Sequence, residues 1–534
     1  MSEEKGNKFV KGAAILAIAG VVIKLLGAVF RIPLTNLLGD DGMAYYGVSY
    51  AVYGVFLVLA TAGIPVAISK LVSERIAIGN HKAAHKVFIV SFGLLFFIGL
   101  VSFLACYFGA SVIAEFVGIP EAALSLKAIA PALFLVPMFS AFRGYFQGRQ
   151  NMNPTAISEI LEQGTRVIVG LSLSFFLIDK GLEQAAAGAT FGASAGAMAG
   201  LGIIVMIYLL NRNIIHKKIS MHNQDVEDTI SILKRIIVIA VPIIIGAEIM
   251  PIMTTIDTGI IINRLQATGW TYEEAKSLYS QYSAYCNSLI AFPQVFTQAV
   301  AISLVPAISG FFRTKDMSKV HENINLGLRT TMIMAFPCAF GIFTLAEPIL
   351  ILLYPLQKAS AIAAAPTLMI MAISVVFLAI SQTTTGILQA IGKQTIPVKN
   401  LAIGAAIKVV VTYLLVGVVA INVRGAAIGT MVAYIITLVL NERAIRKYTD
   451  TTVEFNLTYV KPCIASLVMA VVVFATHRIL LGLAGNSIAT LVGILVGVVV
   501  YGIMIFKIKA ISKEELLLVP GGAKLWKIVN KFMK

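Results

Sequence analysis

The sequence contains unusually little charge. Only 13% of its 534 residues are Asp, Glu, Lys or Arg, whereas a soluble protein carries about a quarter. Hydrophobic residues make up 58% of the chain, and the mean hydropathy is +0.89. The shortage of charge argues against a string of ordinary soluble domains and indicates an integral membrane protein.

Cysteine is scarce as well, and its positions exclude two kinds of site. The four cysteines all fall inside apolar runs, at Cys106, Cys286, Cys338 and Cys463. Thiols in such surroundings are typical of small buried apolar side chains. We therefore expect neither a disulfide framework nor a zinc site.

The motifs of nucleotide hydrolysis and hydrolytic catalysis are missing. The one Gly-Lys pair, Gly392-Lys393, is followed by Gln, so there is no Walker A loop, and neither HExxH nor GxSxG occurs. No segment between the apolar runs is long enough for a catalytic domain. The sequence thus predicts a protein that is not an enzyme, uses no cofactor and does not hydrolyse ATP; a coupling ion, Na⁺ or H⁺, stays open.

Long apolar runs are what the sequence has instead. They last about 20 residues and do not alternate, which favours membrane-spanning helices over a barrel. No cleavage pattern follows the first run, so we expect it to remain as a span. The fourteen predicted spans are 10–36, 43–68, 87–110, 122–147, 155–178, 185–210, 232–262, 281–311, 326–353, 360–390, 398–419, 423–442, 456–480 and 486–507.

The distribution of basic residues predicts the orientation. Fourteen spans place both termini on one side. Of the 42 Lys and Arg, 31 belong to that side, against 7 that lie on the other side or just inside its ends. The positive-inside rule then puts both termini in the cytoplasm. This placement explains the net charge of +16 through anionic lipid, without nucleic acid. The basic, amphipathic segment 508–534 is predicted to lie on the inner leaflet, with partner binding as the alternative.

An internal duplication relates the two halves of the chain. Three matches recur in the same order at offsets of 237 to 242 residues: Pro65 with Pro306, Gly144 with Gly386, and Gly188–Gly192 with Gly425–Gly429. Six spans per repeat is an even number, so the repeats are parallel, and transporters bind substrate at such repeat interfaces. The predicted domains are an N-lobe at 1–215, a C-lobe at 216–447, two extra spans at 448–507 and the tail at 508–534.

Four cations lie within spans, where charge is costly and usually faces a cavity. Lys24 and Arg31 are seven residues apart on nearly one face of the first span. Arg166 follows Pro154 by 12 residues and Lys408 follows Pro397 by 11, so the two are near-equivalent in the repeats. We expect Arg166 and Lys408 on opposite walls of one cavity, where all four cations attract an anionic substrate such as a pyrophosphate.

Several of these residues have a second interpretation. Arg31 is also placed to snorkel to the outer interface, and Arg166 to pair with Glu162 four residues before it. Glu248 and Asp257 in span seven either counter the cations of span one, as a structural ion pair, or couple transport to an ion.

Three polar residues of span eight complete the candidate set. Asn287, Gln294 and Gln298 line the cavity or form hydrogen bonds between helices.

Several stretches of the chain carry family motifs: Lys11-Gly12, Lys24-Leu25-Leu26-Gly27, Arg31, 63–74, 143–148 and 152–163. These stretches resemble the stage V sporulation protein B branch of polysaccharide transporters, and the likeness covers the whole chain. That branch belongs to the multidrug/oligosaccharidyl-lipid/polysaccharide exporter superfamily, which includes the lipid II flippases.

The resemblance implies two six-helix lobes around a V-shaped cavity, a groove for a polyprenyl tail at spans thirteen and fourteen, and alternating access by rocking of the lobes. It places the flippases' basic span-one positions on Lys24 and approximately on Arg31. Their charged pair before the Phe-Pro of span eight is absent before Phe292-Pro293, and an acidic residue early in span two is replaced near Tyr45 and Tyr46. Lipid II as the particular cargo, and the coupling mechanism, therefore stay open.

Together these features predict a flippase that moves an undecaprenyl-pyrophosphate-linked saccharide across the bacterial plasma membrane. Its expected partners are this substrate, membrane lipids and cell-wall synthesis proteins, and the expected state is a monomer. The alternatives are a cation-coupled multidrug antiporter of the same superfamily, which the in-span cations disfavour, and a scaffold that does not transport.

Overall fold

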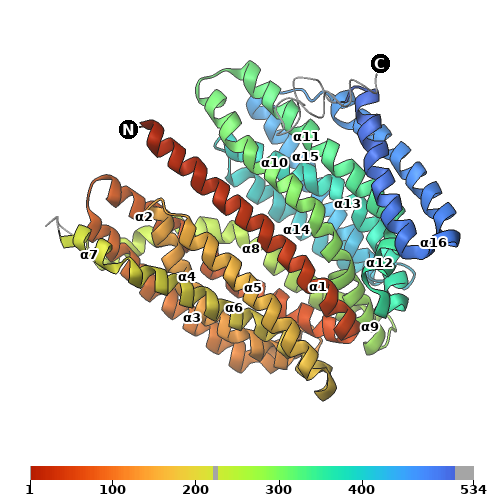
Figure 1. Cartoon of the computed structure of the whole chain (residues 1–534), viewed down its shortest axis with the longest axis horizontal. Helices are drawn as coiled ribbons and strands as arrows, with labels where there is room; N and C mark the ends of the chain where they lie inside the picture. The colour runs from red at the N-terminus through yellow and green to blue at the C-terminus, as the bar shows by residue number, and fades with distance from the viewer. Residues whose placement is uncertain (1, 221–226, 511–534) are drawn as a thin grey trace. The chain divides into compact units, whose positions relative to one another are not determined.

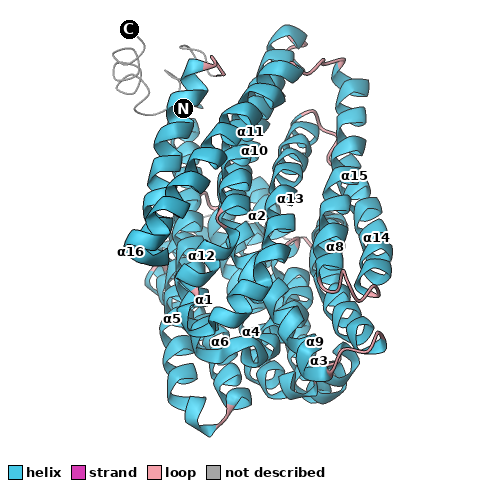
Figure 2. Cartoon of the chain, turned by 90° about the vertical axis from the view of Figure 1, so that its right-hand side faces the viewer, coloured by secondary structure: helices cyan, strands magenta, loops and turns pink. Residues whose placement is uncertain are grey.

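The computed structural model describes residues 2–220 and 227–510, and these form helices joined by short turns, with no strand among them (Figures 1 and 2). Packing divides the chain into unit 1, Met1–Ser280, and unit 2, Gln281–Lys534. The predicted amphipathic tail lies outside the described residues from residue 511 onward.

The described residues of unit 1 form nine α-helices and two short 3₁₀ turns, the turns lying on either side of the α4–α5 pair. Their bounds are α1 (Ser2–Thr61), α2 (Ile64–Ala77), α3 (His81–Val117), η1 (Pro120–Ala122), α4 (Ala123–Gly148), α5 (Asn153–Leu177), η2 (Ile178–Lys180), α6 (Leu182–Leu210), α7 (Arg212–Ser220), α8 (Thr229–Ala267) and α9 (Tyr272–Ser280).

Unit 2 begins inside a continuous helical run with a π-helical turn. Its elements are η3 (Gln281–Cys286), α10 (Asn287–Arg313), α11 (Met317–Thr344), α12 (Ala346–Leu353), η4 (Pro355–Gln357), α13 (Lys358–Ala390), α14 (Thr395–Val416), α15 (Arg424–Thr449), η5 (Asn456–Val460) and α16 (Lys461–Lys507).

Two of these helices fold back on themselves at a glycine. Gly39 in α1 and Gly485 in α16 have φ of 62° and 74°, a left-handed conformation that only glycine adopts without steric cost. Figure 1 shows α16, in blue, as two limbs that lie side by side. Beyond the Gly485 turn, a Cβ on Gly497 would lie 2.9 Å from the Val473 side chain, so the limbs pack directly.

The apolar character of these helices confirms a membrane protein. Among the described residues, twelve helical segments are long and apolar enough to cross a bilayer. Val22–Ala77 contains the second predicted span and the later part of the first, and Asn456–Lys507 contains the last two predicted spans. The structure therefore confirms an all-helical chain with long apolar helices.

Helix ends differ from the predicted spans where proline or polar sequence intervenes. The second predicted span runs to 68, but α1 ends at Thr61 and α2 starts at Ile64, because Pro65 lacks the N–H that a continuous helix needs and suits the first turn of a new one. The polar helix α9 lies before the predicted start of span eight, because its composition hides it from a search for apolar runs.

The units found by packing do not coincide with the lobes predicted from the repeat. Helices α8 and α9 belong to unit 1 by packing, whereas the predicted C-lobe starts at 216. Gly63, between α1 and α2, lies against the Ala240 backbone of α8, and the Lys276 amine of α9 lies 3.4 Å from Asp41 beside the α1 turn. The lobe boundaries therefore stay a prediction.

Candidate functional site

Arg166 lies in an aromatic cage made by the two limbs of α1. Its guanidinium carbon lies 4.6 Å from the centroid of the Tyr50 ring and 5.8 Å from that of Phe30. The guanidinium also donates to the Tyr46 hydroxyl at 3.4 Å and to the Gln163 amide oxygen at 3.5 Å. Stacking on aromatic faces stabilises a desolvated cation. Arg166 is thus held through its faces and edges, not by an acid.

The cage exists because α1 turns back at Gly39. Phe30 lies on the first limb and Tyr46 on the second, and their ring centroids are 6.1 Å apart although sixteen residues separate them. Along a straight helix the same separation would be about 24 Å. The sequence analysis missed Tyr50; the signal was the spacing of Tyr46 and Tyr50, which four residues place on one helix face.

Glu162 pairs with a different arginine from the one its spacing suggests. Its Oε2 lies 2.9 Å from Arg143 Nη2 on α4, and Arg143 Nε also donates to the Ser158 hydroxyl at 3.0 Å. Within the described chain Arg166 and Glu162 form no ion pair, so the i,i+4 interpretation of Arg166 is wrong. Glu162 pairs with an arginine on the neighbouring helix α4 and not with the arginine four residues later on its own helix. The pair therefore helps to hold α4 and α5 together.

Arg166 and Lys408 occupy the same register in two duplicated helix pairs. A Cβ on Gly192 of α6 would lie 2.7 Å from the Arg166 carbonyl oxygen, and a Cβ on Gly429 of α15 would lie 3.3 Å from that of Lys408. Each cation therefore has a repeat glycine packed on its backbone.

The register continues one helical turn away. Gly188 and Gly425, four residues before those glycines, meet Leu173 and Leu415, and each leucine lies seven residues after its cation. The helix pairs α5–α6 and α14–α15 thus approach each other closely at the same positions relative to the cation.

The cations differ in burial. Lys408 is buried, with 8% of its surface exposed, and Arg166 is half-buried. On α1, Arg31 is half-buried and Lys24 is exposed. Gly27, between Lys24 and Arg31, faces Gln163 of α5, since a Cβ there would lie 3.8 Å from the Gln163 amide nitrogen. The first limb of α1 thus packs on the helix that carries Arg166.

The two acids of α8 are both buried, with 7% of Glu248 and 4% of Asp257 exposed. Neither carboxylate oxygen of Glu248 has a hydrogen-bond partner among the described residues. The interpretation of Glu248 as a counter-ion to the span-one cations is therefore wrong for the part of the chain described. A buried carboxyl without a hydrogen-bond partner is costly in a membrane helix, which makes Glu248 a candidate functional residue.

In unit 2 the three polar candidates of α10 differ in how far they are exposed. Asn287 opens α10 directly after the π-helical turn and is half-buried, as is Gln294, whereas Gln298 is exposed. Their neighbour Thr297, missed by the sequence analysis, donates to the Gln382 amide oxygen of α13 at 2.7 Å. Hydrogen bonding between helices is therefore present on α10, beside the half-buried polar groups.

The described residues contain no group of three or more His, Cys, Asp or Glu side chains placed to hold a metal ion. The candidate residues are cations, aromatic rings and buried acids on membrane helices. Such an arrangement is suited to binding an anionic group.

These features define an all-helical, multi-pass membrane protein with one cation at the same register of each duplicated helix pair. The chain belongs to the polysaccharide biosynthesis protein family, whose model matches residues 9–312. A second model, MatE, matches residues 283–414.

Relatives from Bacillus subtilis (strain 168) match over most of their length. An uncharacterized membrane protein, YabM, is 30% identical over 98% of this chain and 96% of its own length. Stage V sporulation protein B is 25% identical over 96% of this chain and 98% of its own, and the lipid II flippase MurJ is 26% identical over 83% of each. These matches confirm the resemblance seen in the motifs.

Solved structures share the fold. An inward-facing multidrug resistance MATE family transporter of the MOP superfamily matches with a TM-score of 0.69 at 16% identity, over 82% of this chain and 99% of that structure. Lipid II flippase MurJ in an inward closed conformation matches with a TM-score of 0.66 at 18% identity, over 91% and 97%. The chain is a plasma-membrane protein of this superfamily, whose members here are transporters and flippases.

Proposed function

We propose that this protein moves a lipid-linked saccharide, carried on undecaprenyl pyrophosphate, across the bacterial plasma membrane by alternating access. The observation that carries the proposal is the pair of cations, Arg166 and Lys408, at one register of two duplicated helix pairs. Two fixed positive groups within a membrane protein match the two phosphates of a diphosphate. The family relationship supports a saccharide as the cargo.

The proposed topology has fourteen crossings with both termini in the cytoplasm. The bends at Gly39 and Gly485 support fourteen, because each divides one apolar helix into two limbs. In this proposal six helices form each lobe, and the hairpin of α16 provides a groove for the polyprenyl tail. Polyprenyl chains are apolar, and exposed apolar residues such as Leu483, Leu495 and Val498 line this helix.

The residues that we assign to the substrate have separate roles. Lys24, Arg31, Arg166 and Lys408 attract the diphosphate, and the aromatic cage fixes the direction of Arg166. The polar side chains of Asn287, Gln294 and Gln298 offer hydrogen bonds to sugar hydroxyls. Glu248 is a candidate for ion coupling because its carboxyl is buried and without a partner in the described chain.

The test is complementation of a deletion strain by the double variant Lys24→Gln/Lys408→Gln. We expect loss of function with normal membrane expression, because the diphosphate loses two of its counter-charges. The matched control is Lys315→Gln/Lys399→Gln, which removes two exposed lysines from unit 2 and should complement fully. Full complementation by the Lys24/Lys408 variant would refute the assignment of these cations.

A cation-coupled multidrug antiporter is the second candidate, favoured by the MatE match at 283–414 and by the buried Glu248. A pump for cationic drugs needs acids in its cavity, and the in-span cations oppose it. Growth of the deletion strain in a panel of cationic drugs separates the two. Hypersensitivity that Glu248→Gln fails to reverse would favour the antiporter over the flippase.

A further inference from the structure

A cavity of about 300 Å³ opens between two helices of unit 1, away from the cations discussed above. It is lined by Lys70, Leu71 and Glu74 of α2 and by Lys234, Arg235 and Val238 of α8. We call it the α2–α8 groove. Its lining combines amines with aliphatic side chains, which is the composition of a site for an amphipathic anion.

The two lysines of the groove lie at the same level. Gly63, just before α2, packs on Ala240 and Ile244 of α8, so the two helices run antiparallel from that contact. Lys70 follows Gly63 by seven residues and Lys234 precedes Ala240 by six. These nearly equal distances along the two helices, in opposite sequence directions, therefore bring the two lysines to about the same height.

Exposed apolar surface continues from the lysines toward the Gly63 end of the groove. On α8, Val238, Val241 and Ile245 follow Lys234 on one helix face and are 72%, 43% and 61% exposed. On α2, Val66 lies one turn before Lys70 and is 48% exposed. The charged end of the groove is thus followed by an aliphatic track, as a phospholipid requires.

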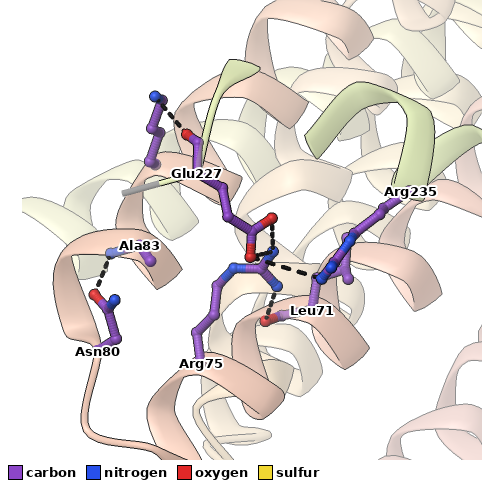
Figure 3. A network of polar contacts seen from close by, with 7 residues as sticks. Leu71, Arg75, Asn80, Ala83, Glu227 and Arg235 are labelled. Carbon is purple, nitrogen blue, oxygen red and sulfur yellow. Dashed lines mark hydrogen bonds and ion pairs between the residues drawn. The ribbon is translucent and has the colours of Figure 1, made fainter. Parts of the chain in front are cut away.

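The neighbouring arginine network leaves these lysines available. Figure 3 shows Glu227 held between Arg75 and Arg235, with both carboxylate oxygens 2.7 Å from Arg75 Nη2 and one of them 3.6 Å from Arg235 Nη1. Lys86, from α3, donates to the Glu227 carbonyl oxygen at 2.7 Å. Lys70 and Lys234 form no ion pair with any described residue, and Glu74 is the one acid among the lining residues. The groove therefore keeps a positive balance.

We propose that the α2–α8 groove binds one anionic phospholipid as a resident lipid. Its phosphate lies between the Lys70 and Lys234 amines, Arg235 adds a third donor, and one acyl chain follows Val238, Val241 and Ile245. With the proposed orientation, this lipid comes from the inner leaflet, where anionic headgroups meet basic residues. The site is separate from the proposed transport cations and does not need them.

Native mass spectrometry of the full chain in detergent tests the site, with phosphatidylglycerol and phosphatidylcholine as probes. We expect one phosphatidylglycerol to remain bound at activation energies that strip phosphatidylcholine. Lys70→Gln/Lys234→Gln should weaken this binding by about tenfold, from the loss of two charge contacts. The control variant, Lys315→Gln/Lys399→Gln, should bind like the wild type.

A second variant separates a shaped site from general attraction to a basic surface. Val238→Trp fills the groove without changing charge, and we expect it to remove the same bound lipid. Equal phosphatidylglycerol binding by the wild type, Lys70→Gln/Lys234→Gln and Val238→Trp would overturn the proposal. Displacement of the lipid by undecaprenyl diphosphate at equal concentration would also overturn it, because the groove would then belong to the transported substrate. Complementation by Lys70→Gln/Lys234→Gln reports on transport independently.

Discussion

The α5–α6 pair of unit 1 and the α14–α15 pair of unit 2 repeat one helix contact with different residues. In the first pair, Gly192 faces the backbone of Gly170; in the second, Gly429 faces Thr412, and a Cβ there would lie 2.5 Å from its Oγ1. Both facing residues come four positions after the cation. At this contact α6 and α15 both carry a glycine, whereas the facing residue of α5 is glycine and that of α14 is threonine.

One turn further, the small residue changes sides. In unit 1 the glycine is on α6: a Cβ on Gly196 would lie 2.5 Å from the Glu162 carbonyl oxygen of α5. In unit 2 the glycine is on α14: a Cβ on Gly404 would lie 2.7 Å from the Ala433 carbonyl oxygen of α15. What the duplication preserves is the distance between backbones, not the residue that permits it. Close approach of this kind drives helix association in membranes, because lipid removes the hydrophobic drive.

The largest effect should come from removing the positive charge from both registers. Arg166→Gln/Lys408→Gln should abolish complementation, because a diphosphate would meet neither counter-charge. Arg166→Lys/Lys408→Arg keeps both charges and should retain part of the activity, limited by the loss of stacking that the guanidinium makes with Tyr50. Equal activity of the neutral and the charged double variants would show that the positive charges at these two positions do not bind the substrate.

The next effect distinguishes the two pairs. Gly192→Ala places a Cβ against backbone atoms of α5 and should lower stability by about 2 kcal/mol. Gly429→Ala meets a side chain instead, so its smaller loss should be recovered by Thr412→Ala in the same chain. Thermal unfolding in detergent measures both. If Val167→Ala, a side-chain change beside this contact, restored the stability lost in Gly192→Ala, the clash would not be with the backbone of α5, and the explanation would be wrong.

A smaller effect concerns the aromatic cage of Arg166 in unit 1. Tyr50→Leu should lower stability by about 1 kcal/mol through the lost cation–π contact with Arg166. Tyr50→Phe keeps the ring face and should be nearly neutral. Thermal unfolding of the three proteins decides, and equal losses for Leu and Phe would show that the hydroxyl matters more than the ring.

The smallest effect tests which arginine Glu162 serves. Glu162→Gln weakens the pair with Arg143 and should cost about 0.5 kcal/mol. In a double-mutant cycle, Glu162→Gln should couple with Arg143→Met and be additive with Arg166→Met. Coupling of Glu162→Gln with Arg166→Met instead would show that Glu162 pairs with Arg166 after all.

The helices could be predicted largely from the sequence, because length and apolar content dominate in lipid. The fourth predicted span, 122–147, nearly coincides with α4, Ala123–Gly148. The equivalence of Arg166 and Lys408 followed from the repeat alone, and the glycine contacts of each unit have the same register. The sequence is thus enough to predict a feature that depends on one helix alone or on the internal duplication.

The surroundings of the cations could not be predicted. The cage of Arg166 depends on the turn at Gly39, which brings Phe30 and Tyr46 together from two limbs. The partner of Glu162 comes from a neighbouring helix, which an i,i+4 rule does not see. Glu248 is buried and has no hydrogen-bond partner in the described chain. This could not be predicted, because it depends on how α8 packs against other helices and not on the nearby sequence.

Transport by the purified protein tests the central claim most directly. The measurement is the rate at which a fluorescent saccharide on undecaprenyl diphosphate crosses the membrane of proteoliposomes, for the wild type, Lys408→Arg and Lys408→Gln. The account predicts that Lys408→Arg transports and that Lys408→Gln is slower by about 30-fold or more, the cost of removing one buried counter-charge. Equal rates for Lys408→Gln and the wild type would contradict it.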